Sequence, residues 1–183
     1  LENRVPLLGF AGGPLTVASY LFPGSKDLAN LKKMMFASSE AFGKLMHSLC
    51  QWTEEHLVAQ AEKGVHALVI MDSWSGHLSP SDYRSIVYPG MRALIENVKS
   101  RTRLPVLMYA NGANGILPEM HQLSATGIGL DWRVDLETQF RDQPETLYQG
   151  NLDPCTLFAS GTEVESRTKR LLKTVSDRPH IFN

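Results

Sequence analysis

Short apolar segments alternate with longer amphipathic segments along the chain. The apolar runs have the length and composition of buried strands, and the segments between them repeat apolar residues every three to four positions, as helices do. The expected strands are Pro6–Ala11, Ala67–Met71, Pro105–Ala110, Ile128–Leu130, Thr146–Gln149 and His180–Asn183. The expected helices lie around Leu15–Leu21, Ser38–Lys63, Ser79–Val98, Leu117–Leu123, Asp135–Phe140 and Thr162–Val175. This alternation is typical of a parallel α/β fold.

Several local signals mark where the helices begin and end. Ser79–Asp82 combines an N-cap serine, a proline at the first helical position and an acid at the third. Thr162–Glu165 has the spacing of a capping box, and Gly64 stands where a helix C-cap is expected. Pro89–Gly90 is expected to interrupt the helix that follows Ser79.

The chain length bears on the type of α/β fold. A barrel of eight strand–helix units needs about 250 residues. The chain has 183 residues, is about two units short, and ends inside its last expected strand, at Asn183. An open sheet removes the shortfall but leaves the cut strand unexplained, so an incomplete barrel is favoured. Polar residues gather at the carboxyl ends of the strands, where active sites of parallel α/β proteins lie.

Composition and charge exclude several classes of protein. There are 18 Lys and Arg residues against 19 Asp and Glu residues, and 43% of the chain is hydrophobic. Neither a disordered chain nor a polybasic nucleic-acid binder has this balance. No apolar run approaches the roughly 18–20 residues of a membrane span, and no signal peptide is visible. The two cysteines, Cys50 and Cys155, fit a reducing compartment, and His47 with Cys50 alone does not make a zinc site.

The first strand end is rich in glycine. Gly9–Pro14 matches neither a P-loop nor the GxGxxG fingerprint. Its glycines either bring the backbone close to a ligand or make a tight turn. Tyr20, a few residues later, either directs its hydroxyl into a pocket or packs on its helix.

The later strand ends carry side chains with more than one interpretation. Asp72 is either catalytic or a partner for loop N–H groups. Ser73 lacks the GxSxG setting of a nucleophile, and His77 is either an acid–base group or a loop residue. The side chains at Asp131–Trp132 and Asn151–Asp153 are likewise either part of a functional site or loop residues with a structural role.

Five segments resemble those of one enzyme family, in the same order. Leu8–Thr16 closely resembles the third-strand segment of the uroporphyrinogen decarboxylase family, and Met71–Leu78 is similar to its Asp-Ser/Thr-Trp-Gly-Gly segment. Gly129–Trp132 and Gln149–Pro154 match two further stretches. His180–Asn183 resembles the start of the strand that carries the family's Asn-Leu-Gly-His-Gly. The resemblance covers essentially the whole chain.

The resemblance implies both a fold and a reaction. The fold is a (β/α)₈ TIM barrel, of which residues 1–183 hold roughly the third to the start of the eighth strand, with the N-terminal and C-terminal portions absent. The reaction converts the four acetate side chains of uroporphyrinogen III to methyls, giving coproporphyrinogen III in porphyrin and haem biosynthesis. No metal or organic cofactor, nucleic acid or membrane is implied, and the location is cytoplasmic. A homodimer is left open.

The resemblance also assigns individual residues. Tyr20 matches a tyrosine whose hydroxyl contacts a substrate acetate, and Ser73 matches a Ser/Thr that bonds a substrate carboxylate. Gly12 matches a glycine whose backbone lies against the macrocycle, while Asp72 is expected to be structural. The family's principal catalytic acid, arginine clamp and late histidine fall outside this chain. No catalytic residue is therefore expected in it, and the 183 residues alone are expected to be inactive.

Two alternatives remain at this point. Related barrels are zinc-dependent methyltransferases acting with corrinoid or thiol substrates, with His-x-Cys at the end of the fifth strand. Here that position reads Tyr109–Gly112 and offers neither ligand. The second alternative is a catalytically inactive barrel that serves as a binding module.

Overall fold

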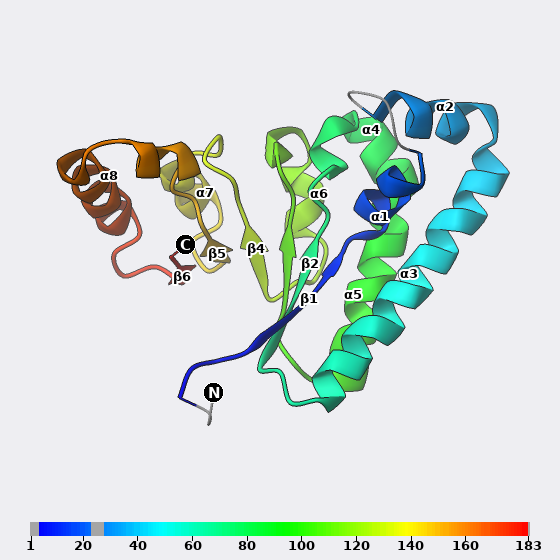
Figure 1. Ribbon diagram of the computed structural model, residues 1–183, viewed down its shortest axis with the longest axis horizontal. Helices are drawn as coiled ribbons and strands as arrows, with labels where there is room; N and C mark the ends of the chain where they lie inside the picture. The colour runs from blue at the N-terminus through cyan, green and yellow to red at the C-terminus, as the bar shows by residue number, and fades with distance from the viewer. Residues whose placement is uncertain (1–3, 23–27, 183) are drawn as a thin grey trace.

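The computed structural model describes residues 4–22 and 28–182, so the expected strand end at Asn183 lies outside it. Six strands form one sheet: β1 Leu8–Gly12, β2 Ala67–Met71, β3 Val106–Tyr109, β4 Gly127–Gly129, β5 Leu147–Gln149 and β6 His180–Ile181. Every neighbouring pair is parallel, and the strands follow each other in chain order (Figure 1). A doubly wound open sheet would reverse this order at its centre, whereas a barrel keeps it. The expected α/β barrel arrangement is thus confirmed.

The helices connect the strands. They are α1 Pro14–Leu21, α2 Ala29–Ala37, α3 Ser39–Glu62, α4 Pro80–Asp82, α5 Tyr88–Thr102, α6 Leu117–His121, α7 Leu136–Asp142 and α8 Gly161–Thr174. Figure 1 shows α3 and α5 side by side against the first strands, and α7 and α8 at the other end of the sheet.

The register of the strands aligns their carboxyl ends. Gly12 pairs with Met71, and each later strand continues the row with its own last residue. The row consists of Gly12, Met71, Tyr109, Gly129, Gln149 and Ile181. The loops that follow the strands therefore start at one edge of the sheet, as the sequence predicted.

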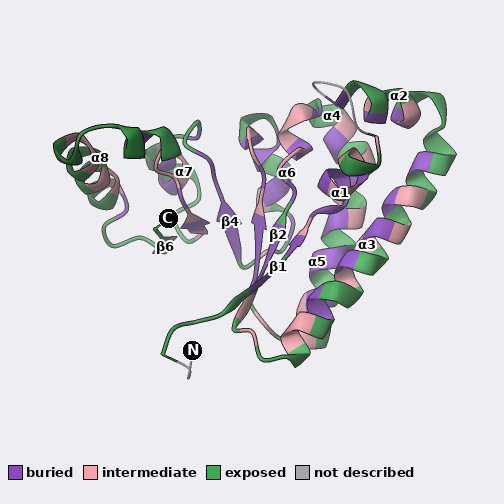
Figure 2. Ribbon diagram, viewed as in Figure 1, coloured by how far each residue is buried: buried purple, intermediate pink, exposed green. Residues whose placement is uncertain are grey.

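The core lies between the sheet and its covering helices (Figure 2). Leu68, Val69 and Ile70 are buried, which confirms the prediction that the middle of β2 is covered on both faces. Met71, predicted in the same run, is 41% exposed; it is the last residue of β2.

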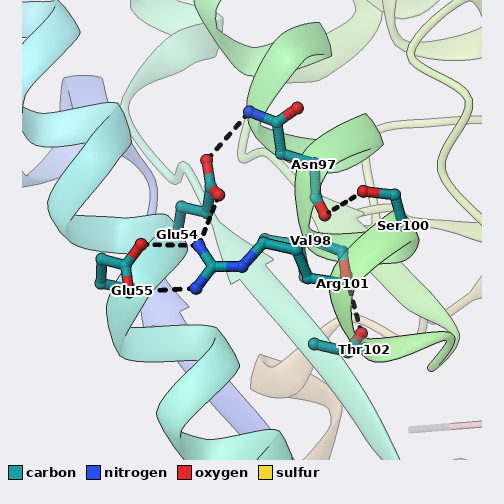
Figure 3. A network of polar contacts seen from close by, with 7 residues as sticks. All are labelled: Glu54, Glu55, Asn97, Val98, Ser100, Arg101 and Thr102. Atoms are coloured by element: carbon teal, nitrogen blue, oxygen red, sulfur yellow. Dashed lines mark hydrogen bonds and ion pairs between the residues drawn. The ribbon is translucent and has the colours of Figure 1, made fainter.

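A polar network joins α3 to α5 on the outside of the core (Figure 3). The Arg101 guanidinium donates to Glu54 Oε1 and Glu55 Oε1, each at 2.6 Å, and the Asn97 amide donates to Glu54 Oε2 at 3.0 Å. The hydrogen bond from Arg101 lowers the pKa of Glu55. These contacts fix the two long helices against each other at the surface.

The helix-end predictions are mostly confirmed. The Asp82 N–H donates to Ser79 Oγ at 3.1 Å, and Gly64 has the left-handed φ of +86° that follows a helix end. The capping box at Thr162–Glu165 is wrong. The N-cap of α8 is Ser160, whose hydroxyl accepts from the Glu163 N–H at 3.3 Å. Ser160 and Glu163 have the same three-residue spacing, so two overlapping boxes were available.

The predicted interruption at Pro89–Gly90 is also wrong. The helix continues from α4 through a π-helical turn, Tyr83–Val87, into α5. Tyr88 N–H donates to Tyr83 O, five residues back, and Pro89 then falls in the first turn of α5. The π-helical turn just before Pro89 shifts the hydrogen bonds by one residue, so the helix accommodates a proline that has no N–H to donate.

Candidate functional site

Asp72 joins the first two strand ends. Its carboxylate accepts from the Thr16 N–H at 2.7 Å and from the Ser75 hydroxyl at 2.6 Å. The Trp74 N–H donates to Thr16 Oγ1 at 3.2 Å, so α1 is attached to the loop after β2 twice. Burial raises the pKa of Asp72, which is wholly inaccessible. Asp72 thus bonds a backbone N–H and a loop hydroxyl, as the structural interpretation of this residue predicted.

Two glycines bring backbone segments into close contact at this edge. A Cβ on Gly13 would lie 2.3 Å from Asp72 Cβ, and a Cβ on Gly76 would lie 2.1 Å from the carbonyl oxygen of Asn111. The glycine-rich run at Gly9–Pro14 thus serves close packing at Gly13, and the group it approaches belongs to the protein itself.

Asp131 and Arg133 join the loops after β3 and β4. The Asp131 carboxylate accepts from the Gly112 N–H, from the Arg133 N–H at 2.8 Å and from Arg133 Nη1 at 3.2 Å. Arg133 Nη1 also donates to Asn111 Oδ1 at 3.0 Å, and the guanidinium carbon lies 4.4 Å from the centroid of the Trp132 ring. The Asp131 side chain is only 1% exposed, so it acts as the buried centre of this connection.

Asn151 continues the connection to β5. Its amide donates to the carbonyl oxygens of Asp131 at 2.8 Å and Val134 at 2.7 Å. His180 Nε2 contacts the Gly150 carbonyl and so adds β6. We call the connected loops after β1 to β5, residues 13–16, 72–79, 110–116, 130–135 and 150–160, the strand-end rim.

A cavity of about 370 Å³ opens at the rim between the ends of β3 to β6. It is lined by Tyr109, Leu130, Asp131, Trp132, Asn151, Leu152, Pro154, Leu157 and Phe182. The lining is mainly apolar with a few convergent polar groups, as in small-molecule sites. Burial, and then the charge of Asp131, raise the pKa of Tyr109, so its hydroxyl remains a neutral hydrogen-bond donor.

The predicted substrate-binding residues come from the end of β1, the end of α1 and the loop after β2. Gly12 ends β1, and Ser73 lies two residues beyond its strand partner Met71. Tyr20 lies in the last turn of α1 with its side chain 70% exposed. Within the described ranges, neither the Ser73 nor the Tyr20 hydroxyl has a hydrogen-bond partner. None of the three lines the 370 Å³ cavity; Gly12 lies along a separate groove between β1 and α3.

The sequence reasoning missed Arg133 and Asn111. Both stand close behind a strand, which is the signal that marked Asp131–Trp132 and Asn151. Their pairing across the sheet, however, has no sequence signature.

The cysteine–histidine pair lies on α3 and not in the loops of the rim. His47 is exposed, and burial raises the pKa of Cys50 to about 11, so its thiol stays protonated at neutral pH. Among the residues that the structure describes, no group of three or more His, Cys, Asp or Glu side chains is placed to hold a metal ion. In the same part of the chain, no helix has the length and apolarity needed to cross a membrane.

Fold and rim together define an α/β barrel segment with its polar groups at the carboxyl strand ends. The profile of the uroporphyrinogen decarboxylase (URO-D) family matches residues 1–183. The chain belongs to the uroporphyrinogen decarboxylase family.

Curated relatives agree with this assignment. The chain is 40% identical over 188 residues to the uroporphyrinogen decarboxylase of Trichlorobacter lovleyi, and 41% identical over 188 residues to that of Geobacter metallireducens. All of this chain is covered, and 55% of each relative. The chain therefore spans about half the length of these relatives.

A solved methyltransferase from Methanosarcina mazei has the same fold. It superposes with a TM-score of 0.81 at 18% identity, over 97% of this chain and 52% of that one. This likeness concerns the fold alone. The strand end at Tyr109–Gly112 contains neither His nor Cys, so no observation favours the zinc methyltransferase alternative.

Proposed function

We propose that the protein carrying this chain is a carboxy-lyase that converts uroporphyrinogen III to coproporphyrinogen III in the cytoplasm. The main support for this proposal is the family match over residues 1–183, together with the relatives at about 40% identity. In this reaction a pyrrole ring is protonated, the ring accepts the electron pair released as an acetate loses CO₂, and a proton replaces the lost carboxyl group. No metal or organic cofactor enters this proposal.

The proposal includes closure of the barrel by further strands. Leu8 and Phe10 of the outer strand β1 are 47% and 61% exposed. The Gln60 amide pairs with the free edge of β1: it accepts from the Phe10 N–H and donates to the Phe10 carbonyl, both at 2.9 Å. At the other end, Leu172 of α8 is 47% exposed, and no α8 residue is buried (Figure 2). Since relatives are nearly twice as long, we assign residues 1–183 to the central part of one barrel domain.

Under this proposal the substrate binds at the strand-end rim and the adjoining ends of β1 and α1. The Ser73 hydroxyl donates a hydrogen bond to a substrate carboxylate, the Tyr20 hydroxyl contacts an acetate, and the Gly12 backbone lies against the macrocycle. The free hydroxyls of Ser73 and Tyr20 support these roles, because neither is engaged by the described part of the protein. The acid that stabilises the protonated ring is expected on the remaining part of the barrel.

The test uses the gene product at its native length. Ser73→Ala should lower turnover of uroporphyrinogen about tenfold to a hundredfold, because a hydrogen bond to a charged group contributes about 1.5–3 kcal/mol. Ser73→Thr keeps the donor and should be tolerated. Ser100 is a matched control: it lies on α5, where its hydroxyl bonds the Asn97 carbonyl, and Ser100→Ala should leave turnover unchanged.

Each part of this test has a result that would contradict the proposal. A wild-type protein that does not decarboxylate uroporphyrinogen overturns the proposed function. Loss of activity in Ser73→Thr, or a covalent adduct on Ser73, overturns carboxylate recognition by this residue. Chromatography of the partly decarboxylated intermediates reports both.

A further inference from the structure

Arg133 is the one Lys or Arg in the loops that follow β2, β3, β4 and β5, all of which the structure describes. Elsewhere arginines serve the outer helices: Arg101 bridges α3 and α5, and Arg167 pairs with Glu163 one turn away on α8. No second Lys or Arg in these four loops could therefore bind an anionic ligand in place of Arg133.

The guanidinium of Arg133 is held in one orientation. Nη1 donates to both Asn111 Oδ1 and Asp131 Oδ2, and the guanidinium lies over the Trp132 ring. The backbone is fixed as well, since the Arg133 carbonyl accepts from the Asn114 amide at 3.3 Å. A long side chain restrained in this way loses little entropy when it binds a ligand.

One edge of this guanidinium remains free. An arginine carries five N–H donors. Nη1 is the only side-chain nitrogen of Arg133 that donates to a described residue, and the side chain is 47% exposed. Nε and Nη2 together form the fork that binds a carboxylate through two parallel hydrogen bonds. At Arg84, by contrast, Nε and Nη2 are both engaged by Glu119.

Arg133 lies next to the candidate site. The two residues before it, Asp131 and Trp132, line the 370 Å³ cavity, and the guanidinium carbon is 4.4 Å from the centroid of the Trp132 ring. Asp131 is buried and accepts from three N–H donors, so it orients Arg133 rather than competing at its exposed edge.

We propose that Arg133 is a substrate-binding residue whose Nε and Nη2 receive a carboxylate of the macrocycle, with Asp131, Asn111 and Trp132 as its positioning residues. This inference rests on the proposed function, because it takes the ligand to be a polycarboxylate tetrapyrrole. The carboxylate is either a propionate, which the product keeps, or an acetate, which the reaction removes.

The test compares Arg133→Gln and Arg133→Lys with Arg141→Gln, in the gene product at native length. Arg141 is a matched control because it is exposed on α7 and pairs with its sequence neighbour Asp142 at 3.3 Å. Binding of coproporphyrin and of its tetraamide is followed by fluorescence quenching, and steady-state kinetics use uroporphyrinogen. Wild type should bind coproporphyrin more tightly than its tetraamide. Arg133→Gln should raise KM for uroporphyrinogen with little change in kcat. If the bound carboxylate is a propionate, Arg133→Gln should also reduce the preference for coproporphyrin about tenfold or more, and Arg133→Lys should restore part of the effect.

The outcomes separate the possibilities. A reduced preference for coproporphyrin assigns a propionate; a raised KM for uroporphyrinogen with unchanged coproporphyrin binding assigns an acetate. Equal losses for the acid and the tetraamide, or no change in either measurement, overturn the role of Arg133. If wild type neither binds the porphyrin nor decarboxylates uroporphyrinogen, the proposed function itself is wrong.

Discussion

Replacing Gly76 with alanine tests the contact between the loops after β2 and β3. The new Cβ would lie 2.1 Å from the Asn111 carbonyl oxygen and 2.6 Å from that of Gly112. Non-bonded heavy atoms prefer roughly 3.5 Å, so the two loops must separate by roughly 1 Å. Both obstacles are backbone atoms that cannot rotate away. We therefore expect the upper end of the overpacking range, about 3 kcal/mol. In the gene product at native length this lowers Tm by about 4 °C, since the entropy of unfolding is about 2.1 cal/mol/K per residue and the relatives are nearly twice as long as this chain.

The assay is thermal and urea unfolding followed by circular dichroism, with Gly43→Ala as the matched control. Gly43 lies within α3, and a Cβ there meets no atom within 4 Å. Alanine in such a helical position should stabilise the protein by about 0.5–1 kcal/mol. A change in Tm of less than about 2 °C for Gly76→Ala would refute the close contact between the loops.

Two further predictions concern single polar groups. Tyr20→Phe should lower turnover of uroporphyrinogen about tenfold while the free energy of unfolding changes by less than about 1 kcal/mol, because the exposed hydroxyl has no partner in the described residues; full activity would contradict its substrate role. Asp72 has a native pKa raised above its usual 3.8 by burial, so folding stability falls as pH rises from that value through the native pKa. The Asp72→Asn variant should lack this pH dependence, so its free energy of unfolding should rise relative to that of wild type as the pH rises. Urea unfolding at several pH values measures both proteins. A free-energy difference between them that does not change with pH would count against the raised pKa of Asp72.

The pattern of apolar residues was sufficient to predict the sheet. Ala67–Met71 matches β2 at both ends, because its middle residues, Leu68 to Ile70, are covered on both faces and the apolar run stops at Asp72. Helix continuity was harder to predict. Whether Pro89 breaks a helix depends on the hydrogen bonds of the preceding turn, and the π-helical turn at Tyr83–Val87 was not apparent from residue types.

The candidate site was likewise predictable only in part. That polar groups would meet at one edge followed from parallel strands in register, and Ser73 was predicted as a substrate-binding residue from its family segment. Which groups remain free there could not be predicted, because it depends on pairings between loops. Asn111 and Arg133 are joined across 22 residues of chain.

Ser73 and Ser75 show why such pairings decide function. They have the same hydroxyl and lie two residues apart in one loop. Ser75 donates to the buried Asp72 carboxylate at 2.6 Å, and a donor committed to a buried acceptor is costly to withdraw. The Ser73 hydroxyl has no such commitment in the described chain. The same division holds within Arg133, where Nη1 is committed to the protein and Nε and Nη2 are not. We therefore propose that Ser73 and the outer edge of Arg133 recognise the carboxylate, since these donors can bind a ligand without first breaking a contact of the fold.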